Sequence, residues 1–188
     1  MGLPSIENFD VSFIQRTSDN LKDYNGPNDF TMLLNSLLGL IVVPNETSEG
    51  REFTFDFLGK SLTEFKELKP IFLKNAERLL KGSEEVEQKK FFWLSRSNNE
   101  RDVSDITLRE FLKRMRNGVA HFGITPIALP ESKKEWCGVI LRNYREDEQG
   151  DGTKTETMNF EVCLMQGELE ALADLISQKY LQTVITQQ

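Results

Sequence analysis

The sequence predicts a mainly α fold, with a β-hairpin inserted before the C-terminal helix. Apolar residues recur at the i, i+3, i+4 spacing of an amphipathic helix over 107–122 and again over 169–181. Between these two segments, 136–144 and 157–165 flank the polar turn 146–152, which is the pattern of two paired strands. Helices on both sides of a hairpin therefore define the expected fold class.

Two further helices are predicted near the N-terminus. Apolar residues at helical spacing predict one over 9–24, which Gly26-Pro27 ends. The segment 30–43 is apolar nearly all round and stops at Pro44, so we expect a helix buried in a core or an interface. Residues 45–60 are expected to form a loop.

The middle of the chain is less regular. Residues 61–81 predict one or two short amphipathic helices interrupted near Pro70. Residues 84–93 fit a helix, but the run 91–94 would also suit a strand, and both readings stay open. The polar residues 95–104 predict a linker.

The helix over 107–122 has the clearest pattern in the chain. Thr107 followed three residues later by Glu110 fits a capping box at its start, and Gly123 suits its C-terminal end. The apolar stripe of this helix consists of Leu108, Leu112, Met115, Val119 and Phe122.

The hairpin is expected at about 136–165 with one apolar face. The residues predicted on that face are Trp136, Ile140, Phe160, Val162 and Leu164. The apolar positions from Leu169 to Leu181 then mark a closing helix of about five turns.

Size and composition are those of an ordinary globular domain. With 188 residues, 38% hydrophobic and 28% charged, the chain can bury most of its apolar surface, and we expect residues 1–188 to form one domain. No apolar run reaches the roughly 18 residues that span a bilayer, and residues 1–7 lack the basic and apolar regions of a secretory signal. We therefore expect a cytoplasmic protein without a membrane span.

Cysteine and histidine patterns give no reason to expect a metal or a cofactor. Cys137 and Cys163 form no Cys-x-x-Cys pair, and His121 is the single histidine. The sequence contains no Gly-rich phosphate loop and no Gly-x-Ser-x-Gly motif. We expect two structural thiols, no metal site and no cofactor.

Charge is distributed unevenly along the chain. The net charge of -7 argues against a protein that coats nucleic acid with its whole surface, because phosphate affinity comes from Lys and Arg. Residues 51–116, however, hold 15 basic and 12 acidic residues, a net charge of +3 between two segments of -5 each. Any contact with RNA is therefore expected in this middle segment and at the end of its last helix.

A second face of helix 107–122 carries the candidate functional residues. The residues that fall within about 140° of arc on this face are Arg109, Lys113, Arg116, Asn117, Ala120 and His121. Arg109 and Lys113, with the adjacent Arg114, are candidates for RNA binding, and an ordinary solvated face is the alternative. For His121 the alternative is a C-terminal histidine whose charged form the helix dipole favours.

Arg116 and His121 suit the chemistry of RNA cleavage without a metal. A histidine with a near-neutral pKa can take the proton of a ribose 2′-OH, and a guanidinium can stabilise the charge that builds on phosphorus. Asn117 could orient either group by hydrogen bonds. On an ideal helix, however, residues five apart point about 140° away from each other. We therefore infer a homodimer, in which two such helices meet around the small Ala120.

The segment Arg116-Asn117-Gly118-Val119-Ala120-His121, at the end of a late helix, resembles the HEPN superfamily of ribonucleases. Members carry an Arg, usually followed by a polar residue, with four to six positions between Arg and His; here four positions intervene. The resemblance implies a HEPN-like helical bundle and a dimeric, metal-independent endoribonuclease that leaves a 2′,3′-cyclic phosphate.

The resemblance leaves several roles open. Many relatives are toxins of toxin–antitoxin pairs or act in antiviral defence, which implies an antitoxin or defence partner. Other relatives have lost catalysis and bind RNA or partner proteins. The competing hypotheses are thus an RNA endonuclease with Arg116, Asn117 and His121 as catalytic residues, and a non-catalytic module that dimerises or binds a partner.

Overall fold

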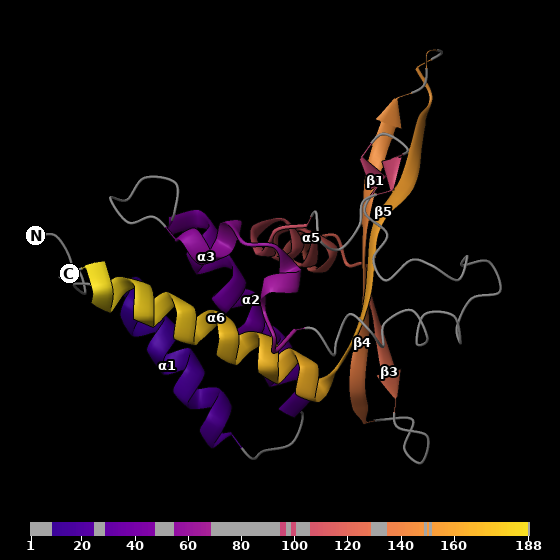
Figure 1. The fold of residues 1–188 in the computed structure, drawn as a ribbon. Coiled ribbons are helices and arrows are strands. Elements are labelled where there is room, and N and C mark those ends of the chain that lie inside the picture. Colours follow the sequence, from indigo (N-terminus) through magenta and orange to yellow (C-terminus); the bar gives the residue numbers. More distant parts are fainter. Residues whose placement is uncertain are drawn as a thin grey trace, which may run out of the picture.

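Helices make up most of the structure, and an antiparallel sheet precedes the last of them (Figure 1). The computed structural model describes residues 9–24, 29–47, 55–68, 95–96, 99–100, 106–128, 135–148, 150 and 152–187. The elements are α1 (Phe9–Asp23), α2 (Asp29–Thr47), α3 (Asp56–Gly59), the 3-10 helix η1 (Leu62–Glu64), β1 (Ser95–Arg96), β2 (Asn99–Glu100), α5 (Leu108–Ala120), β3 (Ile124–Ala128), β4 (Trp136–Glu148), β5 (Lys154–Met165) and α6 (Gln166–Gln187). The predicted mainly α class is therefore confirmed.

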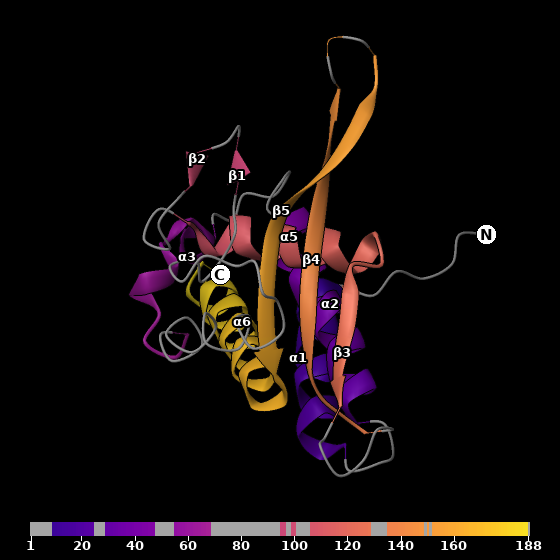
Figure 2. The same cartoon turned by 90° about the vertical axis from the view of Figure 1, so that its right-hand side faces the viewer.

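The helices lie on one face of the sheet (Figures 1 and 2). Helices α1, α2 and α6 contact one another, and α5 lies between α2 and strand β4. Their apolar side chains form one buried cluster. Its members include Leu37, Leu40, Leu112, Leu141, Val162, Leu172 and Ile176. Burial of an amphipathic face against neighbouring elements is the main source of stability for helices of this length.

A buried polar contact ties the first helix to the last. The Tyr180 hydroxyl on α6 donates a hydrogen bond to the carboxylate of Asp10 on α1, and both side chains are buried. The ring of Phe55 stacks on Tyr180 with 4.8 Å between the ring centroids. The hydrogen bond between Tyr180 and Asp10 joins residues that are 170 positions apart in the sequence.

Two predicted boundaries in the first half were wrong. The predicted helix 30–43 continues to Thr47 with Pro44 inside its last turn, and Pro44 is buried. The expected loop 45–60 contains the short helix α3, whose Phe57 and Leu58 are buried.

The middle of the chain also departs from the prediction. Residues 61–68 form only the single 3-10 turn η1, which Ser61 begins with a complete capping box to Glu64. Residues 95–96 and 99–100, expected in a linker, pair as two antiparallel strands. The predictions for 69–81 and 84–94 lie outside the described residues.

The predicted hairpin is part of a three-stranded sheet with the order β3-β4-β5. The short strand β3 was missed because it carries Pro126, which cannot donate to a ladder and is tolerated at a sheet edge. Strand β3 pairs with β4 from Trp136 to Leu141 only. Beyond that point β4 and β5 extend as a two-stranded arm, here called the hairpin arm (143–148 and 154–158), which Figure 2 shows projecting past β3.

The apolar face of the hairpin was predicted one residue out of phase in β4. Directly paired residues of antiparallel strands lie on the same face, and Leu141 pairs with Val162 and Val139 with Leu164. All four are fully buried. Ile140 pairs with Cys163 and therefore lies on the opposite face.

Trp136, the other predicted residue of that face in β4, is partly exposed. Its ring meets the edge of Phe30 on α2, with 5.9 Å between the ring centroids.

Candidate functional site at the end of helix α5

The N-terminal end of α5 is fixed in the core. The Thr107 hydroxyl accepts a hydrogen bond from the backbone N–H of Glu110 at 3.2 Å, which confirms the predicted cap. Leu108, Phe111, Leu112 and Met115 are buried. Phe111 meets the edge of Phe160 on β5, with 5.9 Å between ring centroids. The helix is thus held at a defined position over the sheet.

At the C-terminal end of α5, two backbone N–H groups that follow the helix donate to carbonyls of its last turn. The N–H of Gly123 donates to the carbonyl of Gly118 at 2.7 Å, and the N–H of Phe122 donates to the carbonyl of Val119 at 3.0 Å. This is the Schellman arrangement, in which the residue after the cap adopts a left-handed conformation. Phe122 occupies that position with φ of 58°.

Phe122 therefore does not belong to the apolar stripe in which it was predicted. Its side chain is 86% exposed, because the chain leaves the helix after Ala120 and turns left-handed two residues later. Glycine is the residue usually found there, since it has no Cβ to collide with the backbone.

Two glycines let strand β4 approach this helix end. A Cβ on Gly118 would lie 2.7 Å from the carbonyl oxygen of Arg142, and a Cβ on Gly123 would overlap the same oxygen. The backbone N–H of Arg142 donates to the carbonyl of Gly123 at 2.7 Å. The end of α5 is thereby joined to the middle of β4.

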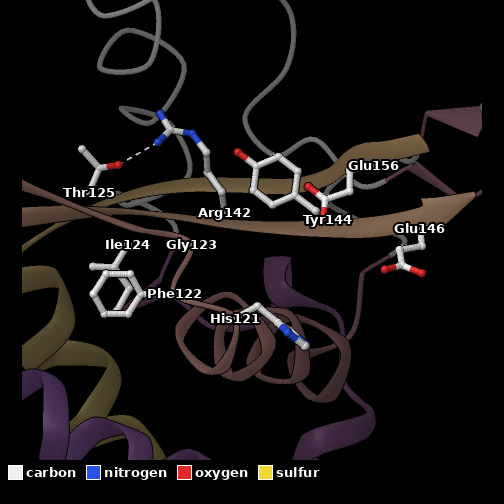
Figure 3. A pocket seen from close by; sticks show the side chains of 9 residues that line it. All are labelled: His121, Phe122, Gly123, Ile124, Thr125, Arg142, Tyr144, Glu146 and Glu156. Carbon is white, nitrogen blue, oxygen red and sulfur yellow. Dashed lines mark hydrogen bonds between the residues drawn. The ribbon is translucent and has the colours of Figure 1, made fainter. Parts of the chain in front are cut away.

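A polar cavity of about 560 Å³ lies at this junction (Figure 3). It is lined by His121, Phe122, Gly123, Ile124, Thr125, Arg142, Tyr144, Glu146 and Glu156. Figure 3 shows His121 and Phe122 on the α5 side of strand β4, while Arg142, Tyr144 and Glu156 project from the other side of this strand.

Arg142 is held in a defined position beside the cavity. Its Nη1 donates to the hydroxyl of Thr125 at 2.8 Å, and its Nε donates to the carboxylate of Glu161 at 3.2 Å. A guanidinium carries five N–H donors, so two such bonds leave donors for a further acceptor. Neither partner of Arg142 lies near it in the sequence.

Carboxylates mark the far end of the cavity, on the hairpin arm. Glu146 and Glu156 are direct cross-strand partners, an arrangement in which like charges repel. Lys154 donates to Glu146 at 2.9 Å, and this hydrogen bond together with the attraction of the carboxylate raises the pKa of Lys154 above 10.5. All three side chains are exposed.

Of the three predicted catalytic residues, His121 is the one that lines this cavity. His121 lines the cavity and is exposed, whereas Arg116 and Asn117, half-buried on α5, are not among the residues that line it. Arg142, which sequence reasoning missed, is the cation among the residues that line the cavity with His121. Its only signal was a basic residue in a predicted strand, and no sequence pattern relates it to a histidine 21 positions earlier.

The predicted RNA-binding cations lie on the surface of α5. Lys113 is exposed, and Arg109 and Arg114 are half-buried. Within the described ranges, no three or more His, Cys, Asp or Glu side chains are grouped so that they could hold a metal ion. None of the described helices combines the length and apolarity needed to cross a membrane.

The lining of the cavity includes three kinds of side chain that can contact or react with RNA. An imidazole can move protons at neutral pH, a guanidinium can hold a phosphate oxygen, and aromatic rings can stack on bases. In the comparison with known families, the family model described as HEPN pEK499 p136 matches residues 1–187. Neither the curated proteins nor the solved structures gave a match to the chain.

Proposed function

Because the chain belongs to the HEPN pEK499 p136 family, we propose that it is a metal-independent endoribonuclease with His121 as its general acid and base. The observation that carries the proposal is the position of His121. The histidine is exposed at the end of α5, and it lines a polar cavity whose lining also includes Arg142. A substrate phosphate can reach a group in this position without any rearrangement of the core.

Each proposed residue has one task in the reaction. His121 takes the proton of a ribose 2′-OH, whose oxygen then attacks the adjacent phosphorus. The bond from phosphorus to the 5′-oxygen breaks, His121 gives the proton that it took to that oxygen, and a 2′,3′-cyclic phosphate remains on the other fragment. Arg116 stabilises the negative charge of the phosphorane, and Asn117 orients the reacting groups.

A second copy of the chain would bring Arg116 to the site. Arg116 does not line the cavity that holds His121 of the same chain. Ala120, one residue before His121, is exposed and small, and it offers a place where two α5 helices can approach closely. We therefore propose a homodimer, and a monomer in sedimentation at the concentration of the assay would contradict this part of the proposal.

The cations on α5 are the proposed RNA-binding residues. Lys113 is exposed on the helix that ends at His121, and Arg109 and Arg114 lie on the same helix. Charge reversal at Lys113 should weaken RNA binding and reduce its dependence on salt, because each phosphate contact contributes to that dependence. An unchanged salt dependence would remove Lys113 from the proposal.

A toxin of a toxin–antitoxin or defence system is the proposed biological role, and it follows from the HEPN resemblance. Growth arrest on expression, abolished by Arg116→Ala, is the result expected for such a toxin.

A non-catalytic HEPN module that binds a protein partner is the second candidate function. The charges of the hairpin arm favour it, because Glu146 and Glu156 at one end of the cavity repel phosphate. This candidate predicts stable assembly with a partner and no cleavage of any RNA.

Cleavage of mixed RNA in the presence of a chelator distinguishes the two candidates. The wild type should yield fragments with 2′,3′-cyclic phosphate ends, and His121→Ala and Arg116→Ala should lose this activity while their circular dichroism stays unchanged. Lys22→Ala, which removes an exposed cation on α1, is the matched control and should cleave normally. Absence of cleavage by the wild type across total RNA would favour the binding module.

A further inference from the structure

We propose that the cavity at the end of α5 binds single-stranded RNA by stacking bases on Phe122 and Tyr144, while Arg142 holds a backbone phosphate. The inference rests on the proposed function, since it names how the substrate of that site is held. It assigns a substrate-binding role to three residues outside the Arg116–His121 segment.

The conformation and the exposure of Phe122 indicate that its ring contacts a ligand. An L-residue in the left-handed region is less stable than glycine, and a bulky side chain there is a rare outlier. At 86% exposure, the ring recovers almost nothing by burial in the fold. Folding alone therefore favours glycine at this position, and strained residues of this kind concentrate at functional sites. A ligand that packs against the exposed ring explains why phenylalanine, and not glycine, occupies this left-handed position.

Tyr144 supplies a second exposed ring in the same cavity. It is 45% exposed and follows Arg142 by two residues on β4, so both side chains project from the same face of the strand (Figure 3). An aromatic ring and a guanidinium on one face match the alternation of base and phosphate along a single strand.

Arg142 is suited to hold a phosphate next to these rings. Its hydrogen bonds to Thr125 and Glu161 fix the guanidinium, and they leave N–H donors for phosphate oxygens. A fixed cation loses little side-chain entropy when it binds. Because Glu146 and Glu156 repel phosphate at the far end, the backbone of the RNA is expected beside Arg142.

The polarity of the cavity favours RNA over an apolar protein surface. The centre of a protein–protein interface is depleted of charged residues. Here the cavity that the two rings line is also lined by His121, Arg142, Glu146 and Glu156. Bases paired in a duplex are already stacked, so the cavity should prefer single strands.

Fluorescence anisotropy with a labelled single-stranded RNA tests the inference. The RNA carries 2′-O-methyl groups at every ribose, so that it binds without being cleaved. Phe122→Gly should weaken binding by roughly fivefold or more, the loss expected for one stacked base, and should also raise the melting temperature because glycine relieves the left-handed position. Phe122→Trp should keep the affinity, whereas a residue with a purely structural role would lose stability in Phe122→Gly.

Three further measurements complete the test. Tyr144→Leu should weaken binding by a similar factor, Arg142→Gln should reduce the salt dependence, and Ile185→Ala is the control, because it removes an exposed apolar side chain from α6. Unchanged affinity in both Phe122→Gly and Tyr144→Leu would overturn the inference, as would equal affinity for duplex RNA. Conversion of a dimer to a monomer by Phe122→Gly would also overturn it, by placing the ring between two copies.

The outcomes separate this inference from the proposed ribonuclease activity. If the wild type cleaves RNA but the aromatic variants bind as tightly as wild type, the activity stands and the inference fails. If the wild type does not cleave any RNA, yet binding of the methylated strand depends on Phe122 and Tyr144, the inference stands and the activity fails.

Discussion

The two ends of helix α5 are built in opposite ways. At the start, Thr107 caps the helix, the backbone N–H of Leu108 donates to the carbonyl of Lys60 at 2.9 Å, and Phe111 is buried against the sheet. At the other end, His121 and Phe122 are exposed, and Phe122 adopts a left-handed conformation. One helix thus joins a fully packed end to an end that presents its side chains to solvent.

This difference shows where the helix gains stability and where it is available for function. The packed end holds α5 in position over β4, so that the exposed end presents His121 at a defined place beside the sheet. Residues at the packed end should therefore govern the free energy of unfolding. Residues at the exposed end should govern binding and chemistry, with little effect on folding.

The largest expected effect is that of Phe111→Ala, compared with Phe122→Ala at the other end of the same helix. Phe111 is 2% exposed, and loss of a buried phenylalanine lowers the free energy of unfolding by about 3–5 kcal/mol. Phe122→Ala should change it by less than about 0.5 kcal/mol, as for other exposed positions. Urea denaturation of both variants measures the difference, and equal losses would break the comparison between the two ends.

Gly123→Ala tests the close contact between Gly123 and strand β4 at the exposed end. The new Cβ would overlap the carbonyl oxygen of Arg142, and backbone must shift to admit it. We expect a loss of about 1–3 kcal/mol in the free energy of unfolding, the range for overpacked sites.

Gly59→Ala is the matched control for this substitution. Nothing lies within 4 Å of a Cβ at Gly59, so its stability should stay the same or rise slightly. A tolerated Gly123→Ala would mean that β4 and α5 are not held together at this point.

Thr107→Ala removes the cap at the packed end. The backbone N–H of Glu110 loses its acceptor, and the expected loss is about 1 kcal/mol in the free energy of unfolding. Thr31→Ala, at an exposed position of α2, serves as the control and should be nearly neutral. Thermal denaturation followed by circular dichroism measures both, and no difference between them would show that the cap contributes nothing.

The smallest expected effect is that of Lys154→Gln on the hairpin arm. The raised pKa of Lys154 means that its ion pair with Glu146 stabilises the fold below pH 10.5, and that this contribution is lost as the pH rises through the folded-state pKa. Since both groups are exposed, the melting temperature at pH 7 should fall only slightly, and less at high salt. A large fall, compared with the exposed control Lys66→Gln, would show that the arm is structurally essential.

Most of the fold was predictable because its signals are local. The periodicity of apolar residues predicted α1, α2, α5, α6 and the hairpin, and the structure confirms them with changed boundaries. Strand β3 was not predictable, since five residues with a proline become a strand only when β4 is present to pair with them. The phase of β4 was wrong for the same reason, because the partner strand and the helices decide which face is buried.

The candidate site was predictable in part. The pattern of helix 107–122 identified His121, and the structure places it in a polar cavity. The same pattern assigned Phe122 to the core, because periodicity does not show where a helix ends. The turn at Phe122 is set by the hydrogen bonds of Gly123 and by the closeness of β4, and neither can be read from apolar spacing.

The sequence by itself determined which segments become helices or strands and which helix carries the only histidine, because these properties depend on residues within a few turns of one another. Only the tertiary structure decided which groups surround that histidine. The backbone of Arg142 reaches the end of α5 because its N–H donates to the carbonyl of Gly123, the residue before β3. Pairing of this kind depends on the register of β3 and β4, which is set by packing over the whole core.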